Sequence, residues 1–246
     1  MVRAAVCREF GKPLVIEDIA IAEPNAGEVK VAIKACAICH SDIFYAEGAW
    51  GGTLPAVYGH EAAGVVEEIG DGVRNVSIGD HVVVTLVRSC GECPCCSRGY
   101  HGSCEASFPL DANTPLKDAK GGKIIHGLRT AAFAEKVVVD ASQVVAIDND
   151  VPFESASLLA CGVITGLGAV PTTAPSEPGT AVVGIGCGGV GLNAIQRAAL
   201  SGARKIIALD LAEDNLEAAL QFGATHAVRA DAADHRDQIK ALTGGR

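Results

Sequence analysis

The first 150 residues contain several short segments in which apolar and polar positions alternate. Residues 29–35 read Val-Lys-Val-Ala-Ile-Lys-Ala, the period of two expected of a strand with one buried face. Turns rich in Gly and Asp, such as 70–72, separate the segments. This pattern predicts a small, irregular β domain. The other predicted strands are 65–69, 81–85, 134–139 and 143–147, and one short helix is predicted over 41–47.

The pattern changes near residue 154, where alternation gives way to longer apolar segments. Residues 155–170 predict a helix interrupted at Gly162 and Gly166, and the prolines of 171–178 predict a loop. Residues 181–185 are apolar without alternation, as in a parallel strand covered on both faces. Strands and helices then alternate, which predicts a β-α-β-α-β-α arrangement around a parallel sheet. The remaining predicted elements are strands over 205–209 and 226–228 and helices over 192–200, 213–222 and 234–242.

Composition narrows the class of protein. A chain of 246 residues has room for one large domain or two modest ones, and 49% hydrophobic residues exclude overall disorder. The formal charge is −9 and no basic run is present, which argues against a nucleic-acid partner. No apolar run approaches the roughly 18 residues of a membrane helix, and the first residues carry charges where a signal peptide would be apolar. We therefore expect a soluble, cytoplasmic protein with no membrane partner.

Five of the ten cysteines lie within residues 90–104. In a reducing compartment, metal binding is favoured over disulfide formation. The spacing Cys90-x2-Cys93-x2-Cys96-x7-Cys104 supplies four thiolates to a closed tetrahedral Zn²⁺ site, which stabilises the fold and takes no part in catalysis. Cys95 breaks this register and is predicted to lie outside the site. The alternative is a set of buried or randomly placed cysteines.

A second, dispersed group of metal-binding residues comes from three separate segments and consists of Cys39, His60 and Cys161. Two thiolates and one imidazole would leave the fourth position of a zinc ion open for water or substrate, as in a catalytic site. The spacing leaves another interpretation open, in which His60 is a core histidine and the two cysteines are small buried thiols.

Residues 186–191 read Gly-Cys-Gly-Gly-Val-Gly, a G-x-G-x-x-G motif that follows an apolar strand and opens a helix. Such glycines let the backbone approach a pyrophosphate, whose charge meets the helix N-terminus. Asp210 ends the next strand and is predicted to accept hydrogen bonds from an adenosine ribose and to repel a 2′-phosphate, which favours NAD over NADP. The alternatives are a glycine turn needed only for packing and Asp210 as a helix N-cap. The predicted cofactor contacts in the motif are Gly186, Gly188, Val190 and Gly191.

Together these residues resemble the zinc-dependent medium-chain alcohol dehydrogenase family. The resemblance rests on Gly59-His60-Glu61-Ala62-Ala63-Gly64, followed by Gly70, and on the four-cysteine spacing. It covers essentially the whole chain. It implies a GroES-like catalytic domain over 1–162, with a structural zinc lobe at 90–104, and an incomplete NAD-binding Rossmann domain over 163–246. Members of the family are usually longer, so we expect a partial sequence that lacks the second half of the nucleotide domain.

The resemblance also implies roles for the residues of the dispersed group. Cys39, His60 and Cys161 match the catalytic zinc ligands of the family, and Glu61 matches a carboxylate that approaches the metal during ligand exchange. Asp42 matches the partner that orients the zinc histidine. The alternative role of Asp42 is a helix-start cap.

Further roles implied by the resemblance concern the proton and the cofactor. Ser41 matches the hydroxyl that takes the alcohol proton, with a helix-start cap as the alternative. His40 falls near the cofactor pyrophosphate, and Thr165 near the nicotinamide or, alternatively, at an ordinary helix position. The chain departs from many members at Phe44, where a relay histidine can stand, and at Asn215, where a Lys or Arg often contacts the adenosine ribose.

The sequence thus predicts an oxidoreductase that transfers a hydride between a zinc-bound alcohol, aldehyde or ketone and NAD. Two Zn²⁺ ions per chain are expected, one catalytic and one structural. The expected partner is a small alcohol or aldehyde, and the complete protein is expected to be a homo-oligomer. The alternatives are a dehydrogenase of thiol adducts (the S-hydroxymethylglutathione type) or of polyols in the same family, and a zinc-stabilised fragment without catalytic activity.

Overall fold

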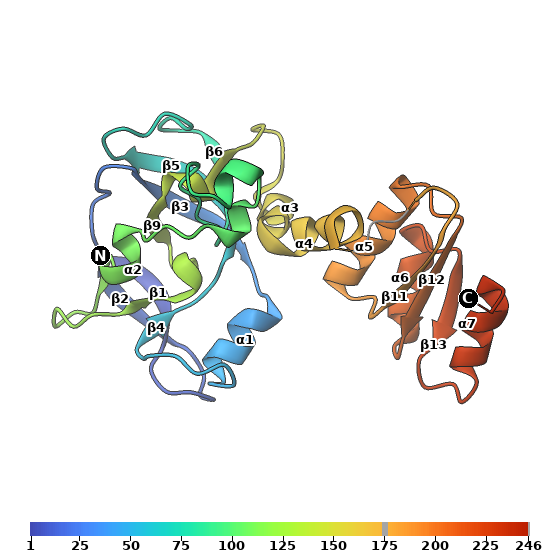
Figure 1. The fold of residues 1–246 in the computed structure, drawn as a ribbon. Helices are drawn as coiled ribbons and strands as arrows, with labels where there is room; N and C mark the ends of the chain where they lie inside the picture. The colour runs from blue at the N-terminus through green and yellow to red at the C-terminus, as the bar shows by residue number, and fades with distance from the viewer. Residues whose placement is uncertain (174–176, 246) are drawn as a thin grey trace. The chain divides into compact units, whose positions relative to one another are not determined.

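The computed structural model describes residues 1–173 and 177–245. It divides into two compact units, Met1–Cys161 and Gly162–Arg246, which are described separately (Figure 1).

The first unit is built on two five-stranded sheets with the orders β7-β2-β1-β4-β8 and β10-β6-β5-β3-β9. Every neighbouring pair in the second sheet is antiparallel, whereas β4 and β8 in the first sheet are parallel. The strands are β1 (Val2–Cys7), β2 (Val15–Ile21), β3 (Glu28–Ala37), β4 (Ala56–Val57), β5 (Glu61–Ile69), β6 (His81–Val84), β7 (Leu116–Lys117), β8 (Ile125–His126), β9 (Lys136–Asp140) and β10 (Val144–Ala146).

The alternation seen in the sequence marks the second sheet. The five predicted strands correspond to β3, β5, β6, β9 and β10, which are the members of that sheet. Val29 and Val31 of β3 and Val82 and Val84 of β6 lie in one buried core, because residues two apart on a strand face the same side. The first sheet was not predicted, since three of its strands are only two residues long and carry no periodic signal.

Three α-helices belong to the first unit: α1 (His40–Ala46), α2 (Pro109–Ala112) and α3 (Phe153–Leu158). Helical structure continues beyond α3 through a π-helical turn (Leu159–Val163), α4 (Ile164–Gly168) and a second π-helical turn (Ala169–Thr173). The predicted interruption at Gly162 falls in the first π-helical turn, where the regular α-helix is broken but the chain stays helical. Gly166 lies inside α4, so no interruption occurs there. Of the predicted loop over 171–178, residues 171–173 belong to the second π-helical turn and residues 177–178 are not helical, while residues 174–176 lie outside the described part of the chain.

The helical segment Phe153–Thr172 also corrects an expectation about the membrane. It has 20 residues and a mean hydropathy of 1.6, so by length and composition one segment does reach the size of a membrane span. Within the first unit, Ala156 and Ala160 are buried against Ala63 and Val83 of the second sheet. Within the second unit, Val170 is buried in the core. Only 28% of the most apolar 18-residue window of this segment is buried.

The second unit is a three-stranded parallel sheet with the order β11-β12-β13. One face is covered by α5 and α6, whose buried residues share a core with Ile206 and Ala208. Ile207, Leu209 and Val228 on the opposite face pack against α7. The elements are β11 (Ala181–Ile185), α5 (Gly189–Leu200), β12 (Lys205–Asp210), α6 (Glu213–Gln221), β13 (His226–Arg229) and α7 (His235–Thr243).

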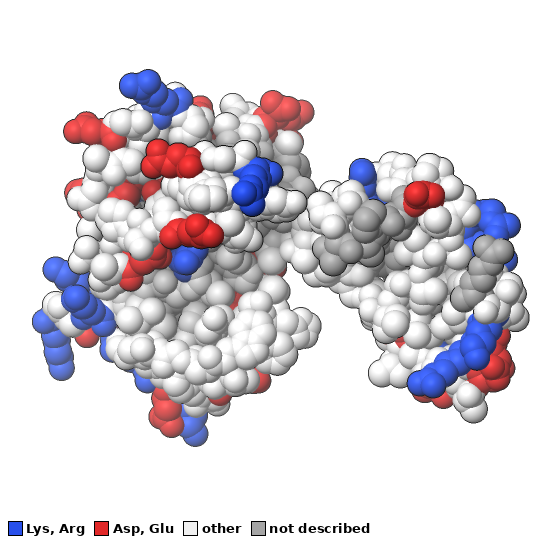
Figure 2. Space-filling model, viewed as in Figure 1, with Lys and Arg blue, Asp and Glu red and all other residues white. Residues whose placement is uncertain are grey.

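Charged side chains are mixed on the face drawn in Figure 2, where Lys and Arg lie singly or in small groups among Asp and Glu. This distribution agrees with the net charge of −9 and the dispersed basic residues of the sequence.

Candidate metal centres and nucleotide loop

Pairing of β3 with β5 brings the first segments of the dispersed metal-binding group together. Ala37 at the end of β3 lies opposite Glu61 at the start of β5, so Cys39, two residues beyond Ala37, comes close to His60. Cys161 arrives from the helical segment after α3, which a hydrogen bond from the Thr85 hydroxyl to the carbonyl of Ala160 ties to the end of β6.

The potential ligand atoms of Cys39, His60, Glu61 and Cys161 all lie within 4.8 Å of one another. His60 and Glu61 are buried, and the two cysteines are half-buried. Cys161 lies in a π-helical turn, a distortion that often occurs at functional sites. Two thiolates, one imidazole and a carboxylate form a donor set that suits Zn²⁺. The structure therefore brings this predicted group together in one place.

The carboxylate of Asp42, which is 2% exposed, organises this site. Its Oδ2 accepts a hydrogen bond from the backbone N–H of Cys39 (2.9 Å), which is the N-cap of α1. Its Oδ1 accepts one from the N–H of Gly59 (2.9 Å) and lies 3.1 Å from Nδ1 of His60. Because Nδ1 donates to Asp42, Nε2 of His60 is left to bind a metal. Asp42 therefore both caps α1 and orients His60.

The pKa of His60 reflects the same contacts. Burial lowers this pKa, but hydrogen bonds and charges from Asp42 and Cys161 outweigh burial and raise it to about 10. Without a metal, the ring therefore holds a proton between the carboxylate and the thiol. A metal ion has to displace that proton when it binds.

Gly59 lets the segment that precedes His60 pass close to the backbone of Phe133. Its φ is +94°, and a Cβ at this position would lie 2.6 Å from the backbone nitrogen of Phe133. A side chain would therefore be strained both in conformation and in space.

The other predicted residues of α1 lie around this site. The Sγ of Cys39 is 3.7 Å from the Oγ of Ser41, so a hydroxyl stands next to the first ligand. His40 is exposed, and its ring centroid is 6.2 Å from that of Phe44, which in turn is 5.1 Å from that of Trp50.

Two residues near the site carried no signal in the sequence. Thr85 acts through its hydrogen bond to Ala160, a contact between segments 75 positions apart. Cys36 lies on β3, three positions before Cys39, and burial followed by the charge of Asp42 raises the pKa of its thiol to about 12. Cys36 is thus an unreactive thiol outside the ligand group.

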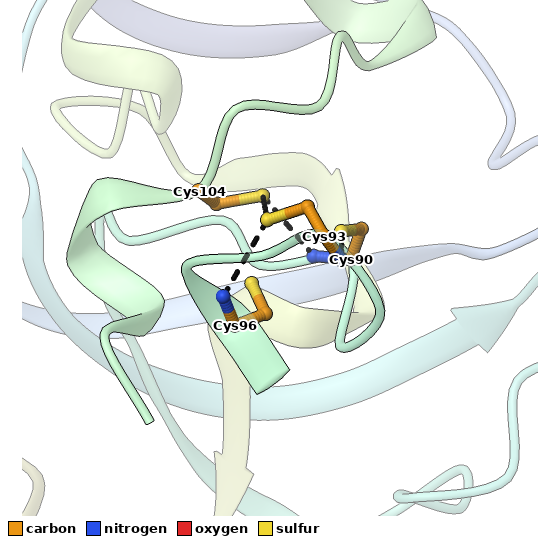
Figure 3. A group of neighbouring side chains, drawn as sticks. All are labelled: Cys90, Cys93, Cys96 and Cys104. Atoms are coloured by element: carbon orange, nitrogen blue, oxygen red, sulfur yellow. Dashed lines mark hydrogen bonds between the residues drawn. The ribbon is translucent and has the colours of Figure 1, made fainter. Parts of the chain in front are cut away.

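The four-cysteine lobe forms a second group, in which all four sulfurs lie within 4.8 Å of one another. Figure 3 shows Cys90, Cys93, Cys96 and Cys104 converging from one short loop and the segment that follows it. Backbone N–H groups donate to the sulfurs, from Cys90 to Cys104 (3.4 Å), from Cys93 to Cys90 (3.3 Å) and from Cys96 to Cys93 (3.5 Å).

These backbone donors favour the thiolate forms of Cys93 and Cys104, whereas burial raises the pKa of Cys96 to about 12. Hydrogen bonds from the backbone of Glu105 and Cys96 lower the pKa of Cys93 to about 6, and those from Ala106 and Cys90 lower the pKa of Cys104. A set of four thiolate sulfurs suits a closed zinc site. The thiol of Cys95 instead points to Glu105, with Sγ 3.5 Å from Oε1, and it is not part of the group.

The glycine motif joins β11 to α5 in the second unit. Gly188 is the N-cap of α5, and the 12 residues of this helix direct its positive end towards the loop. A Cβ on Gly191 would lie 1.9 Å from the carbonyl oxygen of Gly186, so only glycine permits this tight turn. Val190 is 45% exposed beside these glycines, and Thr165 lies on α4, which packs against α5.

Asp210 is hydrogen-bonded to the same glycine loop. Its Oδ2 accepts a hydrogen bond from the N–H of Cys187 (2.6 Å), and its Oδ1 accepts from the N–H of Ala212 (2.9 Å) and from Nδ2 of Asn215 (3.2 Å). The backbone donors Ala212 and Cys187 lower the pKa of the carboxyl. The N-cap of α6 is Ala212, so Asp210 supports the start of that helix without being its cap residue.

Comparisons with known proteins agree with this geometry. Residues 25–149 match the family described as "Alcohol dehydrogenase GroES-like domain", and residues 189–246 match "Zinc-binding dehydrogenase". The chain belongs to the zinc-dependent medium-chain alcohol dehydrogenase family. The predicted fold class is confirmed: a GroES-like β domain followed by part of a Rossmann-type sheet.

Relatives of this chain include alcohol dehydrogenase 1 of Pisum sativum, 40% identical over 90% of this chain and 60% of the relative. S-(hydroxymethyl)glutathione dehydrogenase of Saccharomyces cerevisiae is 42% identical over the same shares. A crystal structure of an alcohol dehydrogenase zinc-binding domain protein from Burkholderia ambifaria has a TM-score of 0.93 and 36% identity, over 99% of this chain and 68% of that one. The chain spans about 60% of the length of the curated relatives it matches.

Proposed function

We propose that the protein is an NAD- and zinc-dependent oxidoreductase that interconverts small alcohols with aldehydes or ketones. The observation that carries the proposal is the convergence of Cys39, His60 and Cys161, whose ligand atoms lie within 4.8 Å of one another, around a histidine oriented by a buried carboxylate. Three such ligands would leave one position of a zinc ion open for substrate.

The residues around this position have separate roles in the proposal. Zn²⁺, when bound, acts as a Lewis acid that draws in the substrate oxygen and lowers its pKa. Asp42 fixes the ring of His60 so that Nε2 points to the metal. Ser41, 3.7 Å from the sulfur of Cys39, takes the alcohol proton. Glu61 supplies a carboxylate that can replace a departing ligand.

The route by which this proton leaves differs from that of relatives with a relay histidine. Phe44 stands at the corresponding position and cannot carry a proton. Water, or the nearby phenol of Tyr45 one turn of α1 after Ser41, therefore takes the proton onward.

The cofactor contacts belong to the second unit. Gly186, Gly188, Val190 and Gly191 let the backbone approach the pyrophosphate of NAD at the N-terminus of α5. NAD supplies the hydride acceptor, while the protein supplies position and charge. In this proposal His40 contacts the pyrophosphate and Thr165 contacts the nicotinamide.

Two zinc ions per chain follow from the two ligand groups, the second being structural and bound by Cys90, Cys93, Cys96 and Cys104. We assign residues 1–162 to the catalytic domain and 163–246 to the NAD-binding part. We further propose a soluble, cytoplasmic protein, because Ala156, Ala160 and Val170 of the helix over 153–172 are buried in the cores of their units. Homo-oligomerisation of the complete protein stays a prediction.

The thiol-adduct alternative has one observation in its favour, the 42% identity to S-(hydroxymethyl)glutathione dehydrogenase of yeast. The two activities share the metal and the cofactor and differ in substrate. Turnover of simple primary alcohols, compared with that of S-hydroxymethylglutathione, separates them.

Zinc stoichiometry combined with NAD titration tests the proposal. We expect two zinc ions per purified chain, binding of NAD⁺ by calorimetry and alcohol-dependent formation of NADH. Cys39→Ser should lower the stoichiometry to one and leave NAD⁺ binding intact. One zinc ion in the unmodified chain, with neither NAD⁺ binding nor turnover, would instead support a zinc-stabilised fragment without activity.

A further inference from the structure

Arg229 lies beside Asp210 at the end of the parallel sheet where dinucleotides bind. Asp210 is the last residue of β12 and Arg229 the last of β13, and the two are partners in the strand register. Val228 points to the side of α7. Arg229 therefore points to the opposite side, where α6 begins and the glycine loop leads into α5.

The guanidinium of Arg229 is held by two carboxylates. Its Nε donates to Oδ1 of Asp231 (3.0 Å) and its Nη2 donates to Oδ2 of Asp231 (2.7 Å), which is a bidentate pair. Its Nη1 also lies 3.6 Å from Oε2 of Glu213, in the first turn of α6. The cation thus has two anionic partners within the chain.

Asp210 has little acceptor capacity left. A carboxylate has about four acceptor positions, and three are occupied by donors from Cys187, Ala212 and Asn215. The remaining position can take the hydrogen of a ribose hydroxyl. A phosphate carries no such hydrogen when fully ionised, and at this place it would meet the carboxylates of Asp210, Glu213 and Asp231 beside the guanidinium of Arg229.

We propose that Arg229 is a specificity-determining residue for the cofactor, and that Asp231 and Glu213 withhold its guanidinium from a 2′-phosphate. This inference rests on the proposed NAD site. Selection of the 2′-hydroxyl then depends on two features, the carboxylate of Asp210 and an arginine whose donors are already occupied. A chain with Arg229 released would accept the 2′-phosphate of NADP⁺.

Calorimetric titration of the 246-residue chain with NAD⁺ and with NADP⁺, which differ only by the 2′-phosphate, tests this inference. Asp231→Asn keeps the shape of the side chain and removes its charge. We expect this variant to bind NADP⁺ about fivefold or more tightly than the unmodified chain, because one repulsive charge is lost and the guanidinium can form charge-assisted bonds to the phosphate. The affinity for NAD⁺ should change by less than about twofold.

Two further variants separate this explanation from a general effect of charge. Asp237→Asn removes one exposed negative charge from α7, which covers the opposite face, and should leave NADP⁺ affinity unchanged. Adding Arg229→Gln to Asp231→Asn should abolish the gain.

The outcomes distinguish this inference from the proposed function. The inference is wrong if NAD⁺ binds normally but Asp231→Asn brings no gain for NADP⁺, if Asp237→Asn brings the same gain, or if the double variant keeps it. Failure of the unmodified chain to bind either dinucleotide overturns the proposed cofactor site itself, and with it the inference.

Discussion

His126 should make the first unit less stable as the pH falls from 7 to 5. Arg88 has no acceptor atoms, so Nδ1 of His126, 3.4 Å from its Nη2, must accept, and Nε2 donates to the carbonyl of Thr130 (3.1 Å). The ring is therefore neutral in the folded protein. Burial, followed by the positive charge of Arg88, lowers the pKa of His126 from 6.5 to about 4.

The sign and size of the effect follow from proton linkage. Between pH 6.5 and pH 4 the unfolded chain binds a proton at His126 that the folded chain excludes, so the stability present above pH 6.5 is lost as the pH falls. A full shift of this size gives a loss of about 2 kcal/mol between pH 7 and pH 5. Because the side chain is partly exposed and solvent screens its charge, we expect about 1–2 kcal/mol.

Urea unfolding at pH 7 and pH 5, followed by the fluorescence of Trp50, measures this loss of stability. Trp50 is the only tryptophan of the chain and belongs to the first unit, so its fluorescence reports the unfolding of that unit. His126→Gln can accept a hydrogen bond but cannot take up the proton, so its pH-dependent loss should be smaller by about 1–2 kcal/mol. Loss of zinc at low pH affects both proteins and cancels in the comparison. The exposed His101, changed to Gln, is the matched control. Equal losses in His126→Gln and the unmodified chain would refute the reasoning.

Three further predictions concern the metal groups and the nucleotide loop. Cys104→Ser removes one of four sulfur ligands and should reduce tightly bound zinc by one ion per chain, measured by elemental analysis; an unchanged content would exclude the four-cysteine site. Asp42→Asn should weaken Co²⁺ binding at the His60 group by about 10–100-fold in absorption titrations, because the histidine loses its orienting anion. Gly191→Ala places a methyl group against the backbone of Gly186 and should lower NAD⁺ affinity at least about tenfold. Gly189→Ala is the control, because its methyl group meets no atom within 4 Å and should leave the affinity unchanged. Similar losses in both variants would contradict the proposed geometry.

The sequence by itself determined those features whose chemistry is contained in one contiguous segment. The four cysteines lie within 15 positions of one loop, so their spacing predicts a common site without knowledge of the fold. The glycine motif and Asp210 are likewise fixed by the order of strand, turn, helix and strand. The five strands of the second sheet were predictable because each has one buried face along its length.

Only the tertiary structure decided which distant residues meet. Cys161 lies 122 positions from Cys39, and their approach depends on the register of β3 with β5 and on the contact of Thr85 with Ala160. The ion pairs of Arg229 with Asp231 and Glu213 likewise depend on how β13 lies beside β12 and the start of α6. Periodicity records which face of an element is apolar, but it does not record which element lies opposite. Contacts between distant segments follow from strand register and packing, and these are settled only when the whole chain folds.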